Sequence, residues 1–299
     1  MRIGIDLGGT KTEGIVMDAS GDIVLRERRP TPQIQGYQAI LDNIKDLVDA
    51  LEKQAGRQCT IGIGTPGAIS AVTDTLKNSN TTCMNGKPFK QDLEALLVRP
   101  VRIENDANCF ALSEAIDGAG REYSVVFGVI IGTGVGGGIV VNKQLLTGSQ
   151  HIAGEWGHNV LVANGPACYC GKRGCVETFL SGPALQYSYR ELGGDTQLTA
   201  QQIVEQAETG EAVADTAVQR YLEYFGQALS VVVNILDPHA IILGGGMSNI
   251  QRLYTEGRKQ LAKHVFNDEL RTRLLINQHG DSAGVRGAAW LWEADETPD

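Results

Sequence analysis

Short apolar runs separated by glycines dominate the first third of the chain. Four of these runs predict buried strands, at 3–7 (IGIDL), 12–17, 60–64 and 100–103. Between them, apolar residues recur every three or four positions over 37–54, which is typical of one face of an amphipathic helix. Asn105 and Asp106 stand where a second helix, running to about Gly118, begins. This part of the chain is therefore predicted to be α/β.

The same order of elements begins again after residue 120. Residues 124–131 (SVVFGVII) predict a buried strand, 132–138 (GTGVGGG) a glycine-rich turn, and 139–142 a returning strand. At the N-terminus, Gly8 and Gly9 separate two strands in the same way. The repeated arrangement predicts two similar α/β lobes.

The last third of the chain is predicted to hold three helices and one strand. A helix over 214–236 ends at Asp237-Pro238, and the strand 239–243 leads to the third glycine turn, Gly244 to Gly246. Ser248 and Gln251 predict a capping box for a helix over 249–266, and 284–293 predicts a short final helix.

Composition and charge exclude some classes of protein. The 299 residues include 37 glycines, and the formal net charge is −9 without any basic run, which argues against nucleic acid as a partner. We find no apolar run long enough to span a membrane, and the apolar N-terminal stretch is too short and too rich in glycine for a signal peptide. A cytoplasmic protein with reduced cysteines is expected.

The three glycine turns are candidate phosphate-binding elements. Each follows an apolar strand, and α/β proteins bind ligands at the carboxyl ends of strands, where glycine lets backbone N–H groups approach a phosphate. Gly132, Gly134 and Gly137 match the dinucleotide fingerprint, but a β-branched run follows instead of the helix that this motif opens. A P-loop motif is absent. The plain alternative is that all three are only tight turns.

The sharpest local pattern is a cluster of cysteine and histidine. His158, Cys168, Cys170 and Cys175 form H-x9-C-x-C-x4-C, a donor set that suits a closed, structural zinc site. The alternative is a loop of reduced thiols.

Several acidic and amide residues are candidates for sugar binding and catalysis. Glu155 and Glu177 flank the metal pattern and suit sugar hydroxyls, although two solvated glutamates would look the same. Asn105-Asp106 provides either a helix N-cap or a general base, and Asp6 is placed to orient Mg²⁺ through water.

These motifs together resemble the ROK family of bacterial sugar kinases and repressors. The matching segments run through nearly the whole chain: IGIDLGGTKT (3–12), IGTPGAIS (63–70), END-AN (104–108), IGTGVGGGI (131–139), GEWGH (154–158), CYCGKRGCVETFLSG (168–182) and VNILDPHAIILGGGMSN (233–249). Within the family, GEWGHN and HGDSAGVRGAAWLW are most similar to bacterial fructokinases of the manno(fructo)kinase kind.

The resemblance implies an actin/hexokinase-like ATPase fold with two α/β lobes and an interlobe cleft. A small lobe is expected over 1–117 together with the C-terminal helix 285–299, and a large lobe with the zinc-binding loop over 118–284. ATP with Mg²⁺, a structural Zn²⁺ and a homodimer are implied as well.

The resemblance also assigns residues. It makes Asp106 the catalytic base and His158, Cys168, Cys170 and Cys175 the metal ligands. The residues implied for the sugar are Gly67, Asn80, Asn105, Asp106, Glu155, His158 and Glu177. Those implied for ATP are Asp6, Gly8, Gly9, Thr10, Lys11, Gly132, Thr133, Gly134, Gly136, Gly137, Gly138, Gly244, Gly245 and Gly246.

The expected activity is ATP-dependent phosphorylation of fructose to fructose 6-phosphate. Kinases of N-acetylglucosamine, glucose or mannose are the alternatives within the same mechanism. A repressor is disfavoured because only five residues precede Asp6, and a binding protein without catalysis is disfavoured by Asp106 and the three glycine turns.

Overall fold

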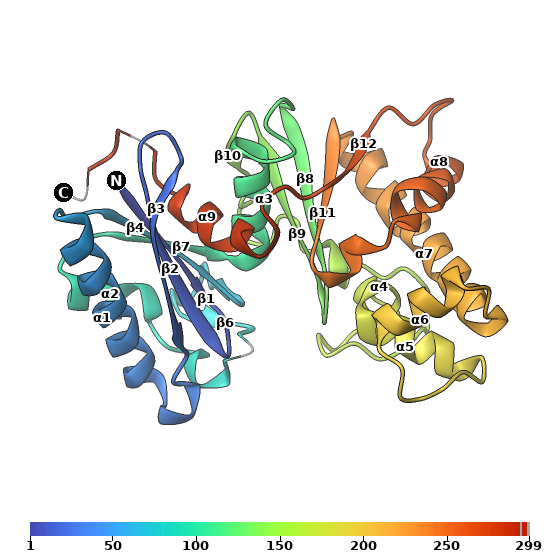
Figure 1. Ribbon diagram of the computed structural model, residues 1–299, viewed down its shortest axis with the longest axis horizontal. Coiled ribbons are helices and arrows are strands. Elements are labelled where there is room, and N and C mark those ends of the chain that lie inside the picture. The colour runs from blue at the N-terminus through green and yellow to red at the C-terminus, as the bar shows by residue number, and fades with distance from the viewer. Residues whose placement is uncertain (80, 294, 298–299) are drawn as a thin grey trace. The chain divides into compact units, whose positions relative to one another are not determined.

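The computed structural model describes residues 1–79, 81–293 and 295–297, and its chain divides into two compact units (Figure 1). The first comprises 1–121, 143–153 and 281–299, and the second comprises 122–142 and 154–280. This division differs from the predicted lobes, because the segments 118–121, 143–153 and 281–284 belong to the first unit.

A five-stranded sheet forms the centre of the first unit. Its order is β3-β2-β1-β4-β7, with β1 parallel to β4 and β4 parallel to β7, while β2 is antiparallel to both of its neighbours. The strands are β1 (Arg2–Leu7), β2 (Lys11–Met17), β3 (Ile23–Pro30), β4 (Thr60–Thr65) and β7 (Val101–Asn105).

The alternation of residues along β1 decides what packs on each face of this sheet. Ile3 and Ile5 lie in one buried core with the apolar faces of α1 (Tyr37–Ala55) and α2 (Phe89–Leu97). On the opposite face, Gly4 and Gly62 let the helix α9 (Ala283–Ala289) approach closely, because a Cβ at Gly62 would lie 1.8 Å from the carbonyl oxygen of Ala288. Because side chains alternate along β1, its isoleucines face α1 and α2, and its glycine faces α9.

The first unit contains several further elements. They are α3 (Asp106–Ile116), the strands β5 (Ala68–Ile69), β6 (Leu76–Lys77) and β10 (Gln144–Leu145), and 3₁₀ turns at Gln33–Gln35 and Thr82–Met84.

The second unit repeats the opening of the first. Its strands run in the order β9-β8-β11-β12, with β8 (Val125–Ile131) antiparallel to β9 (Val135–Val141) and parallel to β11 (Ala240–Gly244), which pairs with β12 (Arg273–Ile276). Both units therefore begin with a strand, a glycine turn and an antiparallel strand, as the repeated sequence pattern predicts.

Helices supply most of the buried core of the second unit. They are α4 (Glu177–Leu180), α5 (Gly182–Glu191), α6 (Ala200–Glu208), α7 (Ala212–Leu236) and α8 (Arg258–His264). The long helix α7 ends where expected, since Asp237 is left-handed with φ 46° and a proline follows. No helix in the described part of the chain combines the length and apolar character needed to cross a membrane.

The predicted helix over 249–266 begins later than expected, at Leu253, and its first turn is π-helical. A 3₁₀ turn (Gly246–Asn249) and a π-helical turn (Leu253–Gly257) precede α8. The Ser248 hydroxyl donates to the carbonyl of Gly245 at 2.7 Å, so it closes the glycine turn instead of capping a helix. The pattern also missed β3, α2, β12 and the short helices α4 to α6.

Candidate functional site

Candidate catalytic residues of the first unit lie at the carboxyl ends of its parallel strands. Asn105 ends β7 and caps α3, because its side-chain oxygen accepts hydrogen bonds from the backbone N–H of Ala107 at 2.8 Å and of Asn108 at 3.3 Å. Its amide group donates to the carbonyl of Gly67 at 3.2 Å. The cap thus fixes the position of Asn105, and Asp106 follows with its side chain exposed.

A concentration of negative charge surrounds Asp6. It lies directly opposite Glu13 in the sheet, and Glu13 is paired with Arg28 at 2.7 Å and Arg26 at 3.0 Å. Burial raises the pKa of Asp6 to about 6, and the charges of Asp106 and Glu13 add to this rise. A bound cation would relieve the repulsion, so the surroundings of Asp6 fit the Mg²⁺ expected there.

The first glycine turn is tightly closed. The Gly8 N–H donates to the carbonyl of Lys11 at 3.0 Å, and the Thr31 hydroxyl donates to the carbonyl of Gly8 at 2.7 Å. Thr10 and Lys11 are exposed beside it, available to a phosphate. Of the remaining sugar-side candidates in this unit, Asn80 lies outside the described residues.

The second and third glycine turns of the chain both lie in the second unit, and they border one cavity. The cavity has a volume of about 870 Å³ and reaches from α5 and α6 to the start of the 3₁₀ turn after β11. A Cβ at Gly132 or Gly246 would meet open space, so a ligand can approach the backbone there. The lining consists of Gly132, Thr133, Gly182, Pro183, Gln186, Thr199, Ala200, Gln201, Val204, Glu205, Glu208, Gly246, Met247, Asn249 and Ile250.

Other glycines of the second turn lie so close to neighbouring side chains that a larger residue would collide with them. A Cβ at Gly134 would lie 2.7 Å from the Glu177 carboxylate, and a Cβ at Gly137 would lie 2.8 Å from the Trp156 ring. Gly136 and Gly138 belong to β9, where they pair with β8, and Gly244 ends β11. Because β9 follows this turn, the dinucleotide fingerprint does not apply.

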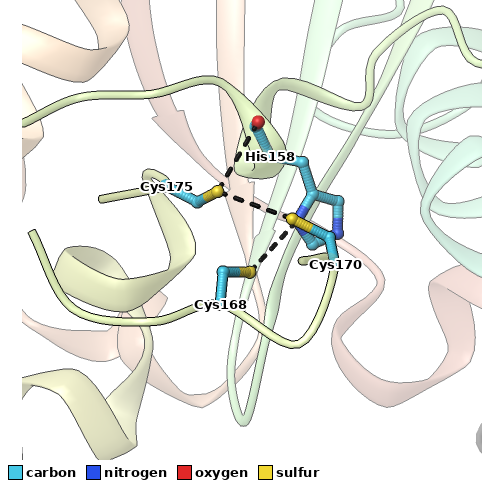
Figure 2. A group of neighbouring side chains, drawn as sticks. All are labelled: His158, Cys168, Cys170 and Cys175. Carbon is cyan, nitrogen blue, oxygen red and sulfur yellow. Dashed lines mark hydrogen bonds between the residues drawn. The ribbon is translucent and has the colours of Figure 1, made fainter. Parts of the chain in front are cut away.

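The four metal-pattern residues come together in one loop, as Figure 2 shows. The Cys168 sulfur lies 3.6 Å from Nδ1 of His158, and the sulfurs of Cys170 and Cys175 are 3.6 Å apart. A tetrahedral ion with ligand bonds of about 2.0–2.3 Å sets its ligand atoms roughly 3.4–3.8 Å apart. One potential ligand atom of each residue lies within 4.8 Å of the others, so the arrangement fits Zn²⁺.

The surroundings of these cysteines shift their thiol pKa values in different directions. Burial raises the pKa of Cys175 to about 12, and hydrogen bonds to Cys170 and Cys168 add to the rise. The pKa of Cys170 is instead lowered, chiefly by a hydrogen bond with the backbone of Lys172. Zinc binds the thiolate form, so metal binding would release the thiol protons that remain.

The remaining sugar-side candidates adjoin this loop. Glu155 is exposed at the start of the 3₁₀ turn Trp156–His158, and Nε2 of His158 lies 3.0 Å from the hydroxyl of Tyr169. One oxygen of Glu177 lies 3.9 Å from the Cys168 sulfur, and the other accepts a hydrogen bond from the backbone of Val135 at 3.0 Å. The loop with the four metal-pattern residues therefore brings Glu177 close to them.

Sequence reasoning missed the cavity residues outside the glycine turns. Gln186, Gln201 and Glu205 carry no local motif, and only the packing of α5 and α6 brings them to the cavity. In the sequence, polar residues at helical spacing are equally typical of a solvent-exposed helix face.

Comparisons with known proteins agree with this geometry. The family model described as ROK family matches residues 2–295. An N-acetyl-D-glucosamine kinase of Yersinia pseudotuberculosis is 39% identical over 306 residues, covering 99% of this chain and 100% of that protein. The crystal structure of a ROK hexokinase from Thermus thermophilus superposes with a TM-score of 0.86 at 29% identity, covering 97% of this chain and 96% of that one. A ROK family glucokinase from Streptomyces griseus, solved with glucose and AMPPNP, gives a TM-score of 0.78 at 30% identity, covering 97% and 98% of the two chains.

The fold is that of the hexokinase-like ATPases, with two α/β units. The chain belongs to the ROK family, and the prediction of a sugar kinase of this family is confirmed.

The prediction of fructose as the substrate is wrong. The curated relatives at 38–39% identity are named N-acetyl-D-glucosamine kinases. One segment that suggested a fructokinase, 279–292, forms α9, whose residues pack against β1, β4 and α3. The composition of α9 is therefore explained by how this helix packs on the sheet.

Proposed function

We propose that this protein is a kinase that transfers the γ-phosphoryl group of ATP to a hydroxyl of N-acetyl-D-glucosamine. The observation that carries the proposal is the identity of 39% with an N-acetyl-D-glucosamine kinase along the full length of both chains. Glucose is the second candidate, because a ROK glucokinase is 30% identical over 97% of this chain.

Asp106 is the general base in this proposal. The proton of the attacking hydroxyl passes to the Asp106 carboxylate, the hydroxyl oxygen forms a bond to the γ-phosphorus, and the bond to the bridging oxygen of ADP breaks. The backbone N–H of Ala107, the second residue of α3, donates to Asp106 at 2.8 Å and fixes one of its two oxygens. Asn105, held by its own cap, would orient the sugar beside it.

The other candidate residues would bind the two substrates. Gly67, Asn80, Glu155, His158 and Glu177 are proposed for sugar hydroxyls and the glycine turns for phosphates. The cavity bordered by Gly132 and Gly246 is proposed for the nucleoside. Mg²⁺, when bound, neutralises charge on the phosphates, and Asp6 is the residue proposed to hold it.

We propose a structural zinc for His158, Cys168, Cys170 and Cys175. Four protein ligands leave no position for water, so the ion would shape the loop that carries Glu177. A homodimer and a cytoplasmic location remain predictions, and light scattering of the purified protein tests the first.

A coupled ADP-release assay with Mg²⁺ tests the proposed activity. Wild type and Asp106→Asn are compared on N-acetylglucosamine, glucose, mannose and fructose. We expect the highest kcat/KM with N-acetylglucosamine and near-complete loss in the variant. A clear preference for another of the four sugars would overturn the proposed substrate and leave the kinase chemistry in place.

A further inference from the structure

Two side chains from the segments that carry sugar-side candidates form hydrogen bonds with the backbone of residues 132–138. The indole N–H of Trp156 donates to the carbonyl of Gly136 at 3.1 Å. The backbone N–H of Val135 donates to Glu177 at 3.0 Å. Both bonds therefore hold the first two residues of β9, which directly follow the glycine turn and belong to the predicted phosphate-binding segment 132–138.

The Trp156 side chain is held in place by the packing around it. Its side chain is buried, and its ring stands edge-on to Phe127 with the centroids 5.9 Å apart. A Cβ at Gly137 would lie 2.8 Å from the Trp156 ring and 2.9 Å from that of Phe127, so the strand is in direct contact with both rings. The indole therefore has a fixed position from which its N–H reaches the turn.

We propose that Trp156 is a positioning residue for the nucleotide, acting through its hydrogen bond to Gly136. This inference rests on the proposed function, because it takes the 132–138 turn to bind ATP phosphates. Gly136 is the second residue of β9 and lies two residues after Gly134, so the bond to its carbonyl holds the strand end to which the glycine turn is joined. Fixing the backbone at this point beforehand reduces the entropy lost when phosphate binds. Affinity for ATP then depends on a side chain that lies between Glu155 and His158 in the sequence.

The test removes the N–H and keeps an aromatic ring. For Trp156→Phe we expect the affinity for Mg²⁺-AMPPNP, measured by calorimetry without sugar, to fall about three- to tenfold, the worth of one buried hydrogen bond. Affinity for N-acetylglucosamine, measured without nucleotide, stays within about twofold of wild type. Trp292→Phe is the matched control, because that indole donates to the carbonyl of Ile61 at 2.7 Å in the first unit and its loss leaves AMPPNP binding unchanged.

A second variant separates the hydrogen bond from the packing. Phe127→Leu removes the aromatic partner of Trp156 and leaves the indole N–H, so we expect lower thermal stability with AMPPNP affinity near that of wild type. Unchanged AMPPNP affinity in Trp156→Phe overturns the inference. So does an equal loss for both ligands, or a loss in Phe127→Leu as large as in Trp156→Phe. Wild-type protein that fails to phosphorylate any of the four sugars contradicts the proposed function instead, and the AMPPNP comparison still tests Trp156.

Discussion

Replacing Asp6 by asparagine is expected to stabilise the protein at neutral pH while removing its activity. The pKa of Asp6 is raised from 3.8 to about 6 in the folded chain, chiefly by burial. A carboxyl whose pKa is higher in the folded state than in the unfolded state destabilises the fold wherever it is ionised. At about 1.4 kcal/mol for each pKa unit, the penalty at pH 7 is about 3 kcal/mol.

Solvent reduces this figure, because Asp6 is only half-buried. We therefore expect Asp6→Asn to gain about 1–2 kcal/mol at pH 7, which corresponds to a rise in Tm of roughly 2–3 °C. Because the pKa of Asp6 is raised in the folded chain, the gain in stability depends on pH. The gain is largest above pH 6, shrinks as the pH falls from about 6 towards about 4, and disappears below that as wild-type Asp6 becomes protonated.

Thermal unfolding without nucleotide or Mg²⁺ measures this gain at a series of pH values. Asp46→Asn, on the exposed face of α1, is the matched control and should change stability by less than about 0.5 kcal/mol. An Asp6→Asn variant that is no more stable than wild type at pH 7, or equally stabilised at pH 7 and pH 4, would refute the electrostatic reasoning. Loss of activity together with higher stability is the signature of a site that holds charge for function.

Three further predictions concern the base, the metal loop and α9. Asp106→Asn keeps an oxygen for its backbone partner, so steady-state kinetics should show kcat lowered by about 10²–10⁴-fold with the Tm almost unchanged; a variant within a few fold of wild type contradicts the assigned role. Cys170→Ser should lower zinc content, Tm and sugar affinity together, as metal analysis and calorimetry would show, whereas zinc-free wild-type protein with the same Tm rejects the metal. Gly62→Ala places a methyl group 1.8 Å from the Ala288 carbonyl and should cost at least about 3 kcal/mol in urea unfolding. Gly14→Ala, which meets only leucine side chains, should cost clearly less, and equal costs would refute the packing argument.

The local elements of the site were largely predictable from the sequence. The short apolar run IGIDL predicted β1, and Gly8 and Gly9 predicted the turn that follows. Asn105 was recognisable as a helix cap because its side chain satisfies N–H groups of its own helix. The four candidate metal ligands were recognisable as a group because three cysteines and a histidine stand at the short spacing typical of structural zinc sites.

Contacts between distant segments were not predictable in this way. Gly137 looked like a residue that lets a phosphate approach, yet the Trp156 and Phe127 rings occupy the space beside it. Ser248 looked like a helix cap, yet its hydroxyl bonds to Gly245. In each case the local pattern is the same for both interpretations, and only the neighbour brought by folding distinguishes them.

The sequence alone determined the α/β class and the repeated strand–glycine turn–strand, and it identified the candidate metal ligands and the candidate base, because each depends on residues close together in the chain. Tertiary structure decided the pKa of Asp6, the cavity beside α5 and α6, and the fastening of the 132–138 turn by Trp156 and Glu177. These properties arise from burial and from charges or dipoles a few ångström apart in space, and residue spacing along the chain does not encode such distances.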